Sequence, residues 1–352
     1  MNAESPAPPL RAVAWWLTVC TVMVFVMVGL GGATRLTESG LSMVEWNPLT
    51  LLPPLTEAQW QAEFATYQRF PEFQAKNAWM TLADFQGIYW LEYIHRLWGR
   101  LIGFVFFVPL VWFAARRRID RSLTIKLAGL FALGGLQGAL GWFMVASGLV
   151  DRPGVSQYRL AAHLVTAFIV YGLMVWVTLD LFRTAVQSRN TDRALSRWAG
   201  AVALAVLLVV VSGALVAGLH AGLIYNTFPL MDGRLLPEGL GDLSPWYANP
   251  FENIMTVQFD HRILALCLVA AIAGVWLRSR QVALDPDARR LAGGVLVMAV
   301  VQAGLGIATL LMVVPLPLAL AHQTGALILF TLAVSLAHSV RVHPVGATPW
   351  PT

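Results

Sequence analysis

Long blocks of apolar residues alternate along this chain with shorter polar segments. A helix that crosses a bilayer needs about 20 predominantly apolar residues, and eight blocks of the chain satisfy this requirement. They lie at 13–33, 89–114, 122–146, 159–182, 198–219, 258–278, 291–314 and 317–340. The pattern therefore predicts an all-α membrane protein with eight transmembrane helices.

The composition supports this prediction, because 57% of the residues are hydrophobic and only 12% are charged. A soluble domain carries about 25% charged residues, so most of the surface is expected to face the lipid bilayer. The formal net charge of +5 is spread over the helix ends and is not gathered on one face. Nucleic acid is therefore not an expected partner.

Basic residues gather in the connections on one side of the expected helices. Arginines occur at 116–121, at 183–197 and at 278–290. The positive-inside rule places these connections in the cytoplasm. An even number of helices then leaves both chain ends in the cytoplasm and the long connections 34–88 and 220–257 outside. The N-terminus resembles neither a cleaved signal peptide nor a transit segment, which favours the inner membrane of a bacterium.

Polar motifs recur in the same order in the two halves of the chain. The E-x-x-H-R motif at 92–96 is followed by Q-x-x-H-R at 258–262, and Gln137 is echoed by Gln302. Shared Leu, Ala and Gly content does not explain polar residues that recur in register. Four crossings restore the starting side, so we predict two tandem four-helix bundles related by a parallel internal repeat. They comprise residues 1–190 and 191–352. Both glutamines are expected to form interhelical hydrogen bonds.

Four of the seven histidines lie at corresponding positions near the start of even-numbered helices. They are His95, His163, His261 and His322. Even-numbered helices run inwards, so all four are expected near the outer face, with one pair in each half. Ionisable side chains are costly in lipid and commonly mark function. Two histidines on facing helices can ligate a heme iron from both sides. The alternative to heme ligation is that each histidine only forms a hydrogen bond with a neighbour at a helix end. A zinc site is less suitable, because zinc would require more ligands than each half offers.

The neighbours of these histidines differ between the halves. Arg96 and Arg262 each follow a histidine directly, where they can bind heme propionates or extend to the interface. Glu92 lies three residues before His95 and shares its helix face, whereas Gln258 is the corresponding residue of the second half. A carboxylate exchanges protons and an amide does not. We therefore expect chemistry in the first half and a held cofactor in the second.

Three of these runs resemble the heme A synthase family, in the branch shared by alphaproteobacteria and mitochondria. They are E-x-x-H-R at 92–96, G-L-S-M-V-E-W at 40–46 and Y-N-T-F-P-L-M-D-G at 225–233. The resemblance extends over nearly the whole chain. Some relatives carry a cysteine pair in an outer loop. Here Cys20 and Cys267 both fall inside expected helices, so a thiol-based step does not carry over.

The resemblance implies oxidation of the C8 methyl group of heme O to a formyl group. Successive hydroxylation and loss of water would give heme A for cytochrome oxidase. In this scheme His261 and His322 ligate a resident heme b. His95 and His163 flank the substrate heme as catalytic residues, with Glu92 beside it. Heme O synthase, cytochrome oxidase assembly factors and an unidentified electron donor are the implied partners.

Two other functions are compatible with the residues alone. A membrane bis-histidine cytochrome b that carries electrons would use both histidine pairs as permanent heme sites, but the Glu92/Gln258 difference argues against two equivalent sites. A transporter would place its polar site near the midplane, at broken helices. The expected position of the histidines near one face argues against transport.

Overall fold

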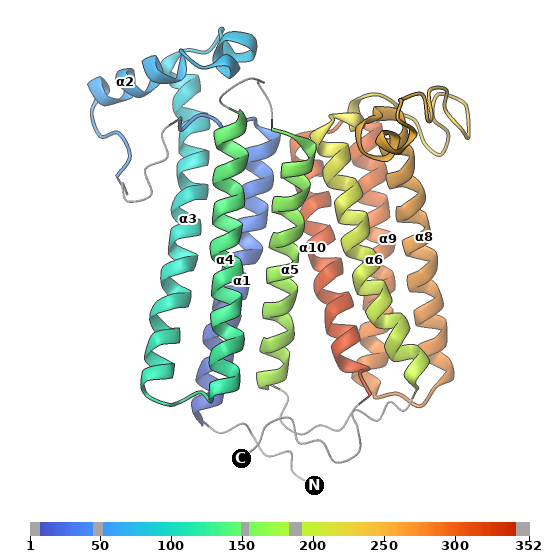
Figure 1. The fold of residues 1–352 in the computed structure, drawn as a ribbon. Coiled ribbons are helices and arrows are strands. Elements are labelled where there is room, and N and C mark those ends of the chain that lie inside the picture. The colour runs from blue at the N-terminus through green and yellow to red at the C-terminus, as the bar shows by residue number, and fades with distance from the viewer. Residues whose placement is uncertain (1–7, 45–51, 149–154, 183–191, 343–352) are drawn as a thin grey trace.

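The computed structural model describes residues 8–44, 52–148, 155–182 and 192–342. Within these ranges, eight helices are long and apolar enough to cross a membrane. This result confirms the predicted all-α membrane fold (Figure 1). The long helices are α1 (Pro8–Leu36), α3 (Leu82–Ala115), α4 (Arg121–Gly148), α5 (Gln157–Phe182), α6 (Arg193–Gly218), α8 (Ile254–Gln281), α9 (Pro286–Leu311) and α10 (Leu316–Ser339).

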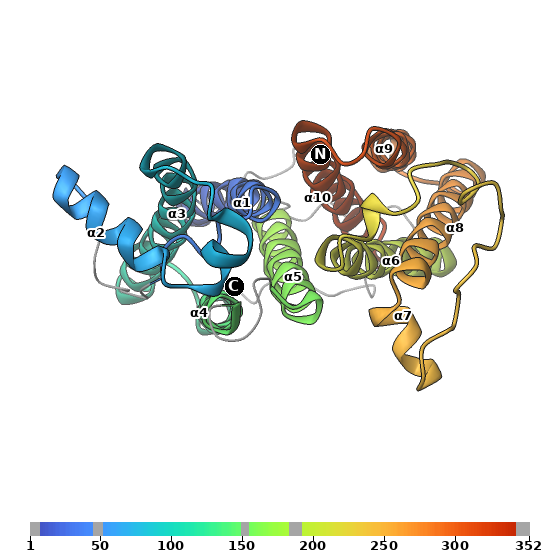
Figure 2. The ribbon, with the colours of Figure 1, turned by 90° about the horizontal axis from the view of Figure 1, so that it is seen from above.

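The long helices form two neighbouring bundles (Figure 2). Helices α1, α3, α4 and α5 contact one another in a ring, and α6, α8, α9 and α10 form a second ring. The bundles meet through α5 and α10, with further contacts of α5 with α6 and of α1 with α10. Each ring contains four long helices that follow one another in the chain, and the parallel repeat itself stays a prediction.

Helix α3 begins at Leu82, well before the apolar block that starts at residue 89. A capping box explains the early start, because Thr81 and Asp84 exchange hydrogen bonds between side chain and backbone N–H. The Asp84 carboxylate accepts from the Thr81 N–H at 2.9 Å. The additional turns carry α3 beyond the bundle and support the connection between α1 and α3 (Figure 1). We call this connection, residues 37–81 without the undescribed residues 45–51, the first outer segment, after the side of the membrane on which it is expected from the sequence. The connection between α6 and α8, residues 219–253, is called the second outer segment on the same ground.

The first outer segment folds on an aromatic core of its own. It contains α2 (Glu57–Tyr67) and a π-helical turn, η1 (Phe73–Asn77). The buried aromatic residues of this core are Trp60 and Tyr67 of α2 and Phe85, Tyr89 and Tyr93 of α3. Ring centroids of Trp60 and Tyr89 lie 5.0 Å apart, in an edge-to-face arrangement that aromatic pairs favour. The outer turns of α3 therefore serve as a platform for this segment.

The second outer segment is held together by asparagines instead. It contains the 3₁₀ turns η2 (Ala221–Leu223) and η3 (Trp246–Ala248) and the short helix α7 (Asn249–Glu252). The Asn253 side chain accepts from the N–H groups of Met255 and Thr256 at the start of α8. The two halves thus differ most in the segments that cover their outer ends.

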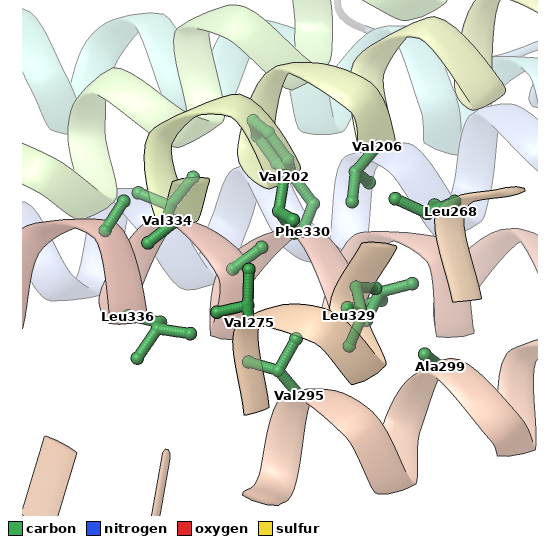
Figure 3. Close-up of a cluster of buried hydrophobic side chains, with 14 of the residues drawn as sticks. Val202, Val206, Leu268, Val275, Val295, Ala299, Leu329, Phe330, Val334 and Leu336 are labelled. Carbon is green, nitrogen blue, oxygen red and sulfur yellow. The ribbon is translucent and has the colours of Figure 1, made fainter. Parts of the chain in front are cut away.

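The largest core lies inside and beside the second bundle (Figure 3). Side chains from α6, α8, α9 and α10 meet there, among them Val202, Leu268, Val295 and Phe330. Many large apolar side chains elsewhere are exposed instead, including Phe104, Leu204 and Val297. Exposed apolar residues of this kind are expected where a helix faces lipid, because the acyl chains provide the apolar environment.

The central contact between the bundles runs along α5 and α10. Tyr171 and Thr331 share a hydrogen bond between hydroxyl groups at 2.8 Å. Towards the end of the bundle opposite the outer segments, the buried His338 ring bonds Asp180 at 2.9 Å, and Arg341 pairs with the same carboxylate at 2.6 Å. His338 therefore connects the two halves at a distance from the other histidines.

Replacement of Gly172 by alanine should destabilise this central contact. A Cβ atom there would lie 2.8 Å from Cε1 of the buried Phe330 ring, and such overpacking costs about 1–3 kcal/mol. We expect a lower midpoint of thermal unfolding in detergent. Gly200→Ala is the matched control, because a Cβ atom at that glycine has no neighbour within 4 Å. Equal midpoints for both variants would contradict the tight α5–α10 contact.

Candidate functional site

All four predicted histidines line one cavity that extends between the two bundles. Its volume is about 2050 Å³, whereas small-molecule sites commonly measure about 300–1,000 Å³. The cavity therefore has room for two cofactor-sized molecules. His95 lies close enough to His163 for an electrostatic interaction, and His261 lies close enough to His322 for the same. The structure thus brings the histidines together in one pair for each half.

Each of these histidine rings packs against a glycine of a neighbouring helix. The pairs are Gly31 with His95, Gly141 with His163, Gly213 with His261 and Gly306 with His322. A Cβ atom on the glycine would meet the nearest ring atom at 3.4, 3.1, 3.1 and 2.8 Å, in that order. An added Cβ atom would therefore crowd the ring at Gly141 and Gly213, would displace it at Gly306, and would only touch it at Gly31. This role was not predicted, although the glycines recur at corresponding positions of the two halves.

The depth of His95 differs from the expectation. It lies about three and a half turns inside α3, because the helix begins earlier than the apolar block, while the other three histidines lie about two turns inside their helices. Its contact with Gly31 nevertheless places it close to the end of α1 at Leu36. Helix α3 therefore continues past the histidine site to reach the first outer segment.

The second-half histidines each have a polar side chain beside Nδ1 of the ring, an acceptor at His261 and an amide donor at His322. The Ser212 hydroxyl donates to the Val209 carbonyl at 2.8 Å, so its oxygen accepts from His261 Nδ1, also at 2.8 Å. This bond leaves the lone pair of His261 on Nε2, where a metal can bind. Gln302 Nε2 donates to the His322 carbonyl at 2.8 Å and lies 3.1 Å from His322 Nδ1.

The first-half histidines are oriented differently. Gln137 Nε2 donates to the His163 carbonyl at 2.9 Å, but it approaches Nε2 of the ring at 3.4 Å. His163 Nδ1 is buried without a hydrogen-bond partner among the described residues. His95 turns Nε2 towards Gly31, and Leu30 occupies the position that corresponds to Ser212. The expected interhelical bonds of both glutamines are therefore present, and among the described contacts of the four rings only His261 donates its Nδ1–H to a side-chain oxygen.

Glu92 is buried and fastens the first outer segment to α3. Its carboxylate accepts from the Ser42 hydroxyl at 2.7 Å and from the Met43 N–H at 2.8 Å. The Arg96 guanidinium pairs with the other carboxylate oxygen. Arg96 also donates to the Met43 carbonyl at 2.7 Å. The E-x-x-H-R motif therefore holds a loop as well as lining the cavity.

The corresponding residues of the second half meet carbonyl groups instead. Gln258 Nε2 donates to the Tyr225 carbonyl at 3.3 Å, and Arg262 donates to Tyr225 and Thr227 at 2.7 and 2.9 Å. A carboxylate cannot donate to a carbonyl, so the amide fits this loop. Arg262 Nε is buried without a partner among the described residues and belongs to the cavity lining. It can receive an anionic group such as a propionate.

The donor set fits a porphyrin-bound iron better than a bare metal ion. No group of three or more His, Cys, Asp or Glu side chains within the described ranges is arranged to hold a metal. Paired imidazoles beside glycines, in a cavity of this size, instead leave room for a flat ligand between helices. Cys20 and Cys267 are free thiols. Glu45 and Trp46 of the run at 40–46 lie outside the described residues.

Comparison with known proteins gives one family. Residues 14–334 match the COX15-CtaA family model, described as cytochrome oxidase assembly protein. A heme A synthase of Nitrosospira multiformis is 49% identical over 334 residues, which is 94% of either chain. One of Paramagnetospirillum magneticum is 50% identical over 337 residues, again 94% of each. One of Parvibaculum lavamentivorans is 48% identical over 329 residues, 93% of this chain and 94% of its own.

Gly306→Ala should lower the amount of heme that the purified protein retains. The added methyl group would lie 2.8 Å from His322 Cε1 and force the ring away from its position. Gly304→Ala in the same helix is the control, because no atom lies within 4 Å of its added Cβ atom. Heme per chain is measured by absorption after purification. Full retention in Gly306→Ala would show that the glycine does not position His322.

Proposed function

This chain belongs to the COX15-CtaA family of cytochrome oxidase assembly proteins, and from that membership we propose that it is an oxidoreductase that converts heme O to heme A. The C8 methyl group of heme O would be oxidised to a formyl group by successive hydroxylation and loss of water. The observation that supports this function best is the presence of two unlike histidine pairs in one membrane-embedded cavity.

The unlike orientation of the pairs supports a division of labour between residues 1–190 and 191–352. We propose that His261 and His322 ligate a resident heme b, because the Ser212 hydroxyl fixes the His261 ring through Nδ1 and leaves its Nε2 free to bind a metal. Fixed ligand rings suit a permanent cofactor. Bound there, the heme would supply one-electron redox chemistry. Arg262 would bind a propionate through its unpaired Nε.

The first half would bind heme O as a substrate that must enter and leave. His95 and His163 would flank it, because neither ring has the Nδ1 restraint that His261 has. Glu92 would stabilise positive charge that develops at the methyl carbon or accept a proton from it. Arg96 would keep this carboxylate in place and contribute to binding a propionate.

The membrane orientation and the partners belong to the same proposal. The protein is a multi-pass membrane protein, and the basic connections would place both chain ends in the bacterial cytoplasm. The cavity and both outer segments would then face the outside of the inner membrane. Heme O synthase would supply the substrate. Cytochrome oxidase assembly factors would receive the product, and a separate donor would exchange electrons.

The direct test is to extract and chromatograph hemes from the protein, purified from cells with and without a heme O supply. We expect heme A or a hydroxylated intermediate only when heme O is supplied. Two heme b molecules per chain under both conditions, with no product, would refute the proposal and favour an electron-carrying cytochrome b.

Alanine replacements of the two pairs should have different effects. His261→Ala and His322→Ala should lose the resident heme b, whereas His95→Ala and His163→Ala should keep it and fail to form product. Heme b per chain and heme A yield are measured on the same samples. Equal loss of heme b from all four variants would contradict the assignment of one resident heme to the second half.

Glu92→Gln should retain heme b and convert heme O at least about a hundredfold more slowly, because acid–base residues commonly contribute that factor or more. The glutamine oxygen can still accept from Ser42 and Met43, but the buried ion pair with Arg96 is lost, so the thermal unfolding midpoint of the variant is measured beside its activity. Glu238→Gln, at an exposed site of the second outer segment, serves as the control. Full activity of Glu92→Gln would exclude the catalytic role.

A further inference from the structure

A second buried carboxyl group lies at the outer end of the cavity. Glu72 precedes the π-helical turn η1, is only 4% exposed and belongs to the cavity lining. It is not part of the E-x-x-H-R motif, and neither the fold nor the heme ligation proposed above requires its charge. A buried acid without a full ionic partner is costly, so its position calls for an explanation.

The contacts of Glu72 define a short hydrogen-bonded chain. The Tyr67 hydroxyl donates to Glu72 Oε2 at 3.2 Å, and the Asn77 side chain donates to the Tyr67 oxygen at 2.7 Å. The other charged groups that interact with Glu72 are Lys76, Arg35, Glu38 and Glu92. Lys76 and Glu38 form an ion pair at 3.1 Å and are each about one third exposed. Glu72 therefore shares one cavity lining with a partly exposed ion pair and with the buried Glu92.

Residues 192–342, the described part of the second half, contain no buried carboxyl group of this kind. In its outer segment, described between residues 220 and 257, the buried polar side chains are the amides of Asn249 and Asn253. Glu238 and Glu252 are exposed. The first half therefore has two buried carboxyl groups at its cavity, Glu72 and Glu92, and the second half has an amide at the position of Glu92. The difference between the halves is larger than the sequence motif alone suggested.

We propose that Glu72 is a proton-exchange group of the first-half site, passing protons between the solvent at the outer mouth and the part of the cavity that holds Glu92. This inference rests on the proposed function, because conversion of heme O includes a step that needs acid and base together. A carbon that carries two hydroxyl groups becomes a formyl group when one hydroxyl gives its proton to a base and the other takes a proton from an acid and leaves as water. That step balances without an oxidant.

The surroundings of Glu72 suit this role. Burial raises the pKa of its carboxyl group from 4.5 to about 7, while the Tyr67 hydrogen bond and Lys76 oppose the rise. A group with a pKa near the working pH both binds and releases protons readily. Two carboxyl groups in unlike environments commonly divide acid and base roles. Glu72 is thus suited to supply protons that Glu92, paired with Arg96, would otherwise have to exchange alone.

A purely structural role for Glu72 has a distinguishable outcome. Glutamine has nearly the same shape, and its amide oxygen can still accept from Tyr67, so Glu72→Gln preserves the connection between α2 and η1. It removes only the ability to titrate. Glu57→Gln in α2 is the matched control, because it removes an exposed carboxylate from the same segment.

The first measurement is thermal unfolding of the heme-loaded protein in detergent from pH 4 to pH 9. Since the folded pKa is raised, burial of Glu72 is favourable below about pH 4.5, and this contribution is lost as the pH rises through about 7. As the pH rises between these values, the unfolding midpoint of wild type should therefore fall relative to that of Glu72→Gln. The difference between the midpoints of wild type and Glu57→Gln should stay constant over the same range. A pH-independent difference would overturn the proposal.

The second measurement is the pH profile of heme A formation. In wild type we expect the rate of heme A formation to change with pH near pH 7. Glu72→Gln should lose this change and convert heme O at least about tenfold more slowly. Glu72→Asp should restore a titrating limb. Tyr67→Phe removes a hydrogen bond that lowers the pKa of Glu72, so its limb should move to higher pH.

The outcomes separate this inference from the proposed function. An unchanged profile in Glu72→Gln, with normal heme A formation, would overturn the proton role and leave the proposed function intact. Absence of heme A from wild type at every pH would overturn both, even if the unfolding data showed that Glu72 titrates.

Discussion

The arrangement of both sites depends on the close approach of an imidazole ring to the backbone of the next helix. A polar ring in an apolar bundle needs a defined place, and a glycine on the neighbouring helix provides it. The same contact occurs four times, twice in each bundle, and it directs the histidines into one shared cavity. If these helices were further apart, the rings would lose their packing against the glycines.

The halves share this frame and differ in what covers it. At the first outer segment, Glu92 accepts hydrogen bonds from Ser42 and Met43, whereas Gln258 donates to a loop carbonyl at the second. One side chain thus satisfies the loop that lies above it and also sets the charge beside a histidine. The difference in loop contacts and the difference in charge between the two halves therefore arise from the same pair of residues, Glu92 and Gln258.

The asymmetry extends from the loops to the histidine rings. Ser212 fixes His261 through Nδ1, while Leu30 stands at the corresponding place of the first half. A fixed ring suits a cofactor that stays, and a less restrained ring suits a ligand that is exchanged. The aromatic cluster under α2 then brings Glu72 to the mouth of the half that would exchange its ligand. Ring restraint, loop contacts and buried acids thus differ in the same direction.

The sequence by itself determined the number of membrane helices, because length and apolar composition suffice to satisfy the bilayer. It also indicated the paired histidines, since polar residues that recur in register within apolar blocks are rarely accidental. Only the tertiary structure decided which glycines receive the rings, since that depends on the distance between helices. It alone showed that Arg96 bonds the Met43 carbonyl and that Glu72 and Glu92 line the same cavity. Such contacts join segments far apart in the chain, and no local pattern encodes their distance.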